Sequence, residues 1–114
     1  MNQSSKKSVS QAWKGALSPS QAAQLAAGVP KWRLSRRPAR LTREFKFRDF
    51  KAAMKFVSEV ADCAEEEEHH PDFQIHWNRV ELVLWTHDLG GLSERDFMMA
   101  AKISRLASGH WTAS

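Results

Sequence analysis

Residues 50–64 carry an apolar side chain at every third or fourth position, and the segments on both sides of them alternate between apolar and polar residues. The first spacing is typical of one face of an α-helix, and the second is typical of a strand with one buried face. Asp49 stands at the N-cap of this helix, which should end by His70 because a residue before proline is disfavoured in the helical region. A helix with one apolar face needs a sheet to cover, so the pattern favours a mixed fold.

Strand patterns occur in four segments, residues 31–34, 39–47, 73–77 and 80–87. The basic, Pro-containing segment 34–40 is predicted to be the turn between the first two strands. A tight turn around Asn78 and Arg79 joins the last two strands, so these should form a β-hairpin.

Two further helices are predicted by their start signals. Ser18 and Pro19 are typical of an N-cap and a first helical position, and that helix should stop at Gly28. Ser93 with Asp96 three residues later is a capping-box start for a C-terminal helix that is apolar on a wide face. The resulting order, α-β-β-α-β-β-α, predicts an α+β fold in which helices pack on one face of a four-stranded antiparallel sheet.

The length of 114 residues suits one domain, and we expect a flexible polar tail over residues 1–16 followed by a single domain over residues 17–114. No segment is apolar enough for a membrane span, and the N-terminus lacks the apolar core of a secretory signal, so we expect a cytoplasmic protein. Cys63 is the one cysteine and cannot form an internal disulfide. Its apolar helical surroundings favour a buried structural thiol.

Charge is divided unevenly along the chain. Residues 1–43 contain nine Lys and Arg and no acidic residue, whereas residues 44–114 contain eight basic and thirteen acidic residues. A basic arm that binds nucleic acid or an anionic surface is one interpretation. A solvated tail followed by a basic loop is the favoured one, so we predict neither a nucleic-acid nor a membrane partner.

Histidines stand out in the second half of the chain, where His69 and His70 precede Pro71 and His87 closes the last strand pattern. Imidazole both donates and accepts protons near neutral pH, so a converging set indicates acid/base chemistry or metal binding. The spacing argues against a metal, because no His-x-x-x-His pair and no second cysteine occur. We therefore predict no metal and no cofactor. His76 and His110 fit no motif and should be surface residues.

Four consecutive glutamates, Glu65 to Glu68, stand at the predicted end of the long helix. The helix dipole favours cations at that end, so this run breaks a local rule, and broken local rules can mark a site. Glu65 lies one turn before His69 and is a candidate site residue. The other three glutamates are interpreted as solvated, and Asp96 most simply caps its own helix.

These motifs together resemble one known family, pterin-4a-carbinolamine dehydratase, over about residues 17–107. The resemblance lies in Trp32, the run 41–50 (LTREFKFRDF), Glu65, the run 69–73 (HHPDF), the run 78–80 (NRV), Thr86 with His87, and the run 91–96 (GLSERD). Phe73 stands where the family more often has Trp, and Trp85 stands where many members have a small residue. The first sixteen residues have no counterpart.

The resemblance implies an enzyme that dehydrates 4a-hydroxytetrahydropterin to quinonoid dihydropterin without a metal. It implies that His69, His70 and His87 are the active-site imidazoles. It also implies that the pterin is bordered by Trp32, Glu65, Pro71, Thr86 and Asp96. The hydroxyl group leaves C4a more readily when protonated, and the N5 proton needs a base, so histidines suit the reaction.

Partners follow from the same resemblance and from one physical argument. The family acts on the product of aromatic amino acid hydroxylases, so such a hydroxylase is the partner that the resemblance implies. The C-terminal helix has two apolar stripes, of which a small sheet covers one, which predicts a homodimer or homotetramer. Animal relatives also act as dimerisation cofactors of a homeodomain transcription factor. A regulatory binding module is therefore the alternative function, and the intact histidine set favours the enzyme.

Overall fold

The computed structural model describes residues 15–113, and in this part of the chain the predicted order of elements is confirmed. The elements are α2 (Pro19–Ala26), β1 (Arg33–Arg36), β2 (Ala39–Lys46), α3 (Phe50–Glu67), β3 (Asp72–His76), β4 (Arg79–Leu84), the short 3₁₀ helix η1 (His87–Leu89) and α4 (Glu94–Ala107). Nearly all of the predicted polar tail lies outside the described residues. Leu17 already belongs to the fold, because its backbone N–H donates to the carbonyl oxygen of Leu92 at 2.8 Å.

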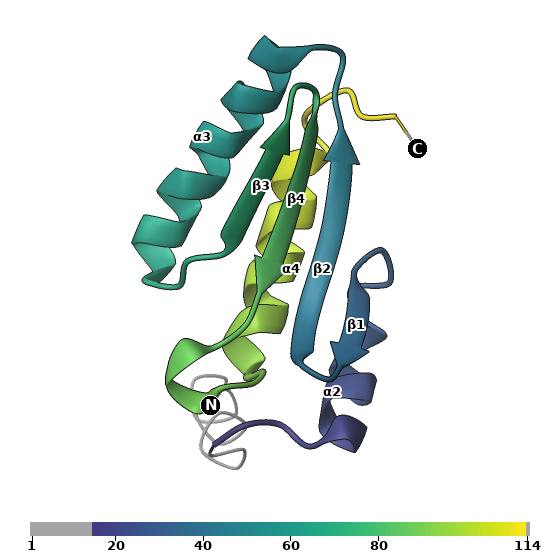
Figure 1. The fold of residues 1–114 in the computed structure, drawn as a ribbon, viewed down its shortest axis with the longest axis vertical. Coiled ribbons are helices and arrows are strands. Elements are labelled where there is room, and N and C mark those ends of the chain that lie inside the picture. Colours follow the sequence, from purple (N-terminus) through teal and green to yellow (C-terminus); the bar gives the residue numbers. More distant parts are fainter. Residues whose placement is uncertain (1–14, 114) are drawn as a thin grey trace, which may run out of the picture.

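The sheet is antiparallel throughout, with the strand order β1-β2-β4-β3, so the predicted fold class is confirmed (Figure 1). In the central pair, Leu41 lies opposite Leu84 and Phe45 opposite Val80. These side chains are buried, whereas their neighbour Glu44 is exposed, as alternation along a strand with one covered face requires. One face of the sheet therefore carries the helices, and the other carries polar side chains.

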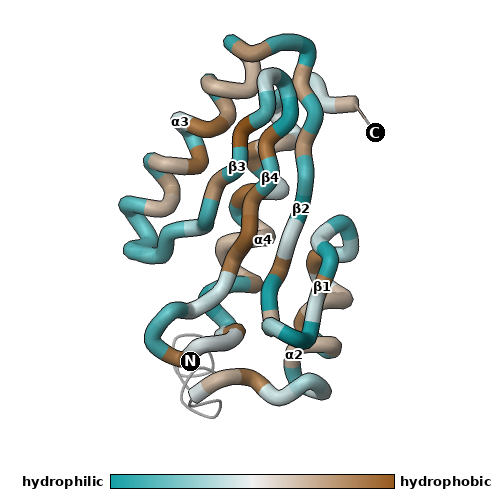
Figure 2. Tube along the Cα trace, viewed as in Figure 1, coloured by the Kyte–Doolittle hydropathy of each residue, from teal (hydrophilic) through white to brown (hydrophobic). Residues whose placement is uncertain are grey.

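The core between sheet and helices is rich in phenylalanine. The Phe56 ring of α3 lies 4.9 Å from the Phe45 ring and 5.0 Å from the Phe47 ring, measured between centroids. Apolar residues gather along β4 and α3, while the turn after α3 is hydrophilic (Figure 2). That turn carries the acidic residues and the His-His-Pro motif, so the motif stands at an end of the core.

Each helix begins at its predicted cap. Asp49 accepts a hydrogen bond from the Ala52 N–H at 2.9 Å, and capping boxes open α2 at Ser18 and α4 at Ser93. The end of α3 explains how its glutamate run is tolerated. The Arg95 guanidinium of α4 donates to the carbonyl oxygens of Glu67 at 3.1 Å and Glu68 at 2.9 Å. A cation from another element thus supplies what the macrodipole requires at this helix end.

Three boundaries differ from the prediction. β1 extends to Arg36, so the first turn is reduced to Arg37 and Pro38. As an edge strand with little burial, β1 needs no apolar alternation, so the sequence does not mark where it ends. The second turn lies one residue earlier than predicted, at Trp77 and Asn78, and β4 ends at Leu84 instead of continuing to His87.

Two predictions about single residues need correction. Cys63 is partly exposed, and desolvation by its surroundings raises the pKa of its thiol, which keeps the thiolate fraction low and agrees with a structural role. The prediction that His110 is a surface residue is wrong. Its side chain is 13% exposed, bonds to Glu59 Oε1 at 2.7 Å and lies edge-on to Phe56. His76 is exposed, as predicted.

The sequence predicts an oligomer because the C-terminal helix, α4, has two apolar stripes, and the structure gives this reason little support. Phe97, Met99, Ala100 and Ile103 of these stripes are buried within the single chain, and Ala101 and Leu106 are partly buried against its core, so little apolar surface of the two stripes is left for a partner. The edge strand β3 remains a pairing surface, with Ile75 exposed. Among residues 15–113, no helix is long and apolar enough to cross a membrane.

We predict a homodimer or homotetramer through strand pairing at such an edge. Light scattering at micromolar protein should give at least twice the chain mass of 13.0 kDa. Replacing Ile75 by Lys on β3 should shift the mass towards that of one chain, because edge lysines oppose strand pairing. A mass of one chain at every concentration would contradict the prediction.

Candidate active site

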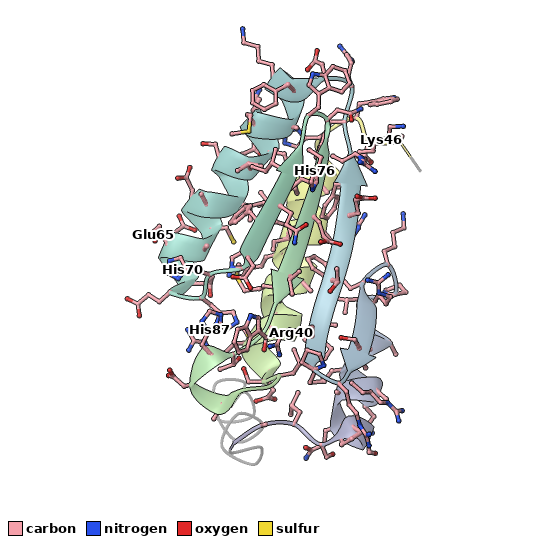
Figure 3. The ribbon with its side chains drawn as sticks, viewed as in Figure 1. Arg40, Lys46, Glu65, His70, His76 and His87 are labelled. Carbon is pink, nitrogen blue, oxygen red and sulfur yellow. The ribbon has the colours of Figure 1, made fainter. Side chains whose placement is uncertain are left out.

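Three chain segments meet at one end of the sheet, namely the turn between α3 and β3, the segment from the end of β4 through η1, and the first turn of α4. Glu65, His70 and His87 lie at this end, whereas His76 and Lys46 lie towards the other (Figure 3). A cavity of about 180 Å³ lies between the segments and is lined by Glu68, His69, His70, Trp85, Thr86, His87, Asp88 and Arg95. All three predicted catalytic histidines therefore border one space.

His69 is fixed by a buried carboxylate. Its Nε2 lies 2.6 Å from Asp96 Oδ1, and Asp96 is 0% exposed. The second oxygen, Oδ2, accepts hydrogen bonds from the Thr86 hydroxyl at 2.8 Å and the Ser93 N–H at 2.9 Å. Asp96 thus caps α4, as predicted, and also joins α4 to the histidine turn and to the segment after β4.

His70 has a carboxylate partner of its own. Its Nε2 lies 2.6 Å from Glu65 Oε2, and both side chains are largely exposed. Glu68, the residue between this helix end and the histidines, has a φ of 53°. This left-handed residue reverses the chain after α3, which lets adjacent histidines meet different carboxylates.

His87 is held by aromatic stacking. Its ring centroid lies 4.0 Å from that of Trp85, and the Arg40 guanidinium carbon lies 3.7 Å from the Trp85 ring centroid. The imidazole and the guanidinium therefore both lie in contact with the same indole. Trp85 Nε1 also donates to Asp72 Oδ2 at 3.0 Å. The indole is therefore held by contacts with His87, Arg40 and Asp72.

The two histidine–carboxylate pairs determine which ring nitrogens are left to exchange protons with a substrate. An ionised carboxylate accepts hydrogen bonds but has no hydrogen to donate, so the Nε2 atoms of His69 and His70 carry the hydrogen in these pairs. Their Nδ1 atoms are left for other partners, with a lone pair in the neutral ring and an N–H in the imidazolium. Such rings can transfer protons in either direction.

The remaining predicted site residues are placed as follows. Glu65 bonds to His70, and Thr86 lines the cavity. Pro71 is buried and does not line the cavity. Trp32 is not brought to this site, because it is 4% exposed in the core and its Nε1 donates to Ser104 Oγ at 3.0 Å.

Sequence reasoning missed two contributors, Arg40 and Arg95. Arg95 stands inside the recognised motif, and its position in the first turn of α4 gave no sign that it reaches α3. Arg40 is far from Trp85 in the sequence. The pairing of Leu41 with Leu84 brings them together, a register that the sequence alone does not state. Among residues 15–113, no group of three or more potential metal ligands is close enough to hold an ion.

Known proteins are similar to this chain over most of its length. The family model described as Pterin 4 alpha carbinolamine dehydratase matches residues 15–106. A protein of Thermomicrobium roseum, provisionally named a pterin-4-alpha-carbinolamine dehydratase, is 46% identical over 86 residues, which cover 75% of this chain and 90% of that protein. A protein of Stenotrophomonas maltophilia with the same provisional name is 46% identical over 84 residues, covering 74% of this chain and 72% of the relative.

Two solved structures are also similar. A transcriptional coactivator/pterin dehydratase from Brucella melitensis superposes with a TM-score of 0.76 at 34% identity, covering 81% of this chain and 98% of that one. A pterin dehydratase-like protein, identified as a RuBisCO assembly factor in the alpha-carboxysome, gives a TM-score of 0.59 at 26% identity. The match covers 68% of this chain and 89% of that protein.

Proposed function

The chain belongs to the pterin 4 alpha carbinolamine dehydratase family, and from that premise we propose that it dehydrates 4a-hydroxytetrahydropterin by histidine acid/base catalysis. The observation that carries the proposal is the convergence of His69, His70 and His87 on one cavity, with two of them bonded to carboxylates. The substrate would be the product of an aromatic amino acid hydroxylase, so the chain would act in pterin recycling.

The reaction needs two proton transfers. A protonated imidazole donates to the hydroxyl oxygen on C4a, the C–O bond breaks, and water leaves. A neutral imidazole accepts the proton from N5, whose electron pair forms the C4a–N5 double bond of quinonoid dihydropterin. Each positioned transfer can contribute about 10²- to 10⁴-fold. His70 and His87 have exposed rings beside the cavity and are the candidates for these transfers.

His69 has a different proposed role. Its ring is nearly buried and is held by Asp96, so its orientation and tautomer are constrained. We assign it to hydrogen bonding with the bound pterin and to shaping the cavity beside His70. Thr86 and Arg95 also line that cavity and would contact the substrate.

The direct test is an assay of the purified chain with freshly generated 4a-hydroxytetrahydropterin. We expect the absorbance of the carbinolamine to decay faster than in buffer, in proportion to protein concentration. Decay at the spontaneous rate would overturn the proposed function. It would favour the regulatory alternative, because one solved relative is named a transcriptional coactivator/pterin dehydratase and another is identified as an assembly factor.

Turnover should be independent of metals. The proposed proton transfers use imidazoles alone, so activity should survive exhaustive treatment with EDTA and with 1,10-phenanthroline. Metal content should be measured on the same samples. Loss of turnover in proportion to metal content, restored by one specific ion, would contradict acid/base catalysis by the histidines.

Trp85 should affect turnover through its contact with His87. Replacing Trp85 by Ser removes the ring that stacks on His87, and an aromatic contact of this kind stabilises by about 0.5–1.5 kcal/mol. We expect kcat to fall about three- to tenfold, and Trp85→Phe to recover most of it. Trp77→Ser changes an exposed tryptophan in the β3–β4 turn and is the matched control. Equal kinetics for both serine variants would contradict this role.

A further inference from the structure

A second and larger cavity, of about 430 Å³, lies away from the histidines. It is bounded by the connection from α2 to β1, by β2 and by the C-terminal half of α4. Three cationic residues line it, Lys31, Arg43 and Arg105, and no acidic residue does. The apolar part of the wall includes Val29 and Ala101.

Arg43 is the most constrained of the three cations. Its Nη1 donates to Ser104 Oγ at 3.0 Å, and its guanidinium carbon lies 4.3 Å from the Phe45 ring centroid. Ser104 Oγ also accepts the Trp32 Nε1–H at 3.0 Å, which fixes the hydroxyl oxygen. The guanidinium is therefore held in place at the cavity wall before any ligand arrives, which lowers the entropic cost of binding.

The charge of Arg43 is not neutralised within the described chain. The ion pairs found among residues 15–113 include none with Arg43, and partial burial lowers its pKa. A partly desolvated cation without a counter-ion is costly, so an anion in this cavity would be stabilised.

Both negative and positive groups contribute to the electrostatic potential at the cavity. The C-terminal end of α4 contributes Ala107 and Ser108, and its dipole equals about half a negative charge. Arg105 also borders a separate groove that contains Glu59, Asp62 and Glu66. Against these, Lys31 and Arg43 contribute two full positive charges, and the basic segment from Arg33 to Arg40 adds to the potential. The balance at the cavity is positive.

We propose that this cavity is a binding site for a small organic anion, whose phosphate or carboxylate group is bound by Lys31, Arg43 and Arg105. The apolar part of the ligand packs against Val29 and Ala101. Arginine forks match both oxyanions, and Arg43 is already oriented by Ser104. The site shares no residue with the histidine cavity, so it does not depend on the proposed dehydratase function.

The test is titration of the ¹⁵N-labelled full chain with three probes of similar size, namely phenyl phosphate, benzoate and neutral benzyl alcohol. We expect saturable shifts of the amide signals of Gly28, Lys31 and Ser104 with one or both anions, and none with the alcohol. Tighter binding of phenyl phosphate would assign a phosphate ligand, and tighter binding of benzoate a carboxylate. No saturation by either anion up to millimolar concentrations would overturn the site.

Variants distinguish binding in this cavity from general attraction of anions to a positively charged surface. Lys31→Gln and Arg43→Gln should each weaken anion binding about tenfold, since each removes a charged hydrogen-bond donor. Arg36→Gln removes one charge from exposed β1 outside the cavity and is the matched control. Lys31 is exposed, so its variant remains informative even if Arg43→Gln fails to fold. Equal weakening by Arg36→Gln and Lys31→Gln would overturn the site.

His70→Ala should bind the anions as the unchanged chain does. A protein that binds phenyl phosphate or benzoate here but lacks turnover would contradict only the dehydratase proposal. A protein with turnover but no saturable anion binding would contradict only this second site.

Discussion

His70→Ala is expected to lower the turnover number for 4a-hydroxytetrahydropterin by about 10²- to 10⁴-fold, the usual contribution of one positioned proton donor or acceptor. The ring borders the cavity and is oriented by Glu65, and its side chain is 59% exposed. Its removal should therefore leave no cavity in the core and no buried group without a partner. The loss should appear in kcat, with a stability change within about 0.5 kcal/mol of zero.

A matched control is available in the same sheet. His76→Ala removes an exposed histidine of β3 that lies well away from the cavity, so its kinetics should equal those of the unchanged chain (Figure 3). His87→Ala should lose activity to a degree similar to His70→Ala, because its ring borders the same cavity. If both His70→Ala and His87→Ala fold and keep near-normal turnover, the proposed active site is wrong.

Asp96→Ala is expected to cost about 3–5 kcal/mol of the free energy of unfolding, because each buried hydrogen-bond donor left without an acceptor costs about 1–3 kcal/mol. The carboxylate is fully buried and accepts from His69, Thr86 and the Ser93 N–H. Its loss leaves the His69 ring N–H and the Ser93 N–H without this acceptor, leaves the Thr86 hydroxyl with Ser93 Oγ as its remaining partner, and removes the link between α4 and the histidine turn. Because domains of this size are stable by only about 5–15 kcal/mol, the variant should be close to unfolding.

Urea denaturation followed by circular dichroism measures this effect. Asp88→Ala is the control, since Asp88 is an exposed carboxylate of the adjacent η1, and its stability should change by no more than about 0.5 kcal/mol. Asp96→Asn keeps the shape of the side chain but places an amide N–H₂ against one of the donors. Its free energy of unfolding should therefore lie between those of Asp96→Ala and Asp88→Ala. A midpoint for Asp96→Ala equal to that of Asp88→Ala would contradict the structural role of this carboxylate.

The glutamate run shows where a local rule and the tertiary structure disagree. At the sequence level, four acidic residues at a helix end oppose the macrodipole and suggested a site. The structure gives them separate roles. Glu65 bonds to His70, Glu67 pairs with Lys102 of α4, and Arg95 of α4 caps the helix carbonyls. Glu65 therefore contacts a histidine of the cavity and Glu68 lines the cavity itself, while the compensation for the macrodipole came from an element that is distant in sequence.

Trp32 and Asp96 illustrate a limit of recognition by motif. Both match family positions and were expected to border the pterin. Asp96 instead reaches the site through His69, since its own carboxylate is fully enclosed. Trp32 is packed in the core on Ser104 and Phe45. A motif gives the residue type at a position, whereas exposure depends on which elements cover it.

The sequence by itself determined the element order, the helix starts and the buried face of each central strand, because caps and periodicity act within a few residues. It also singled out His69, His70 and His87, which line one cavity, since the His-His-Pro turn and the strand after it are local features. Only the tertiary structure decided which carboxylate meets which imidazole, that Arg40 stacks on Trp85, and that most apolar side chains of α4 are buried within the single chain. Those contacts join residues across strand register and helix packing, and their free energies depend on neighbours that no local pattern specifies.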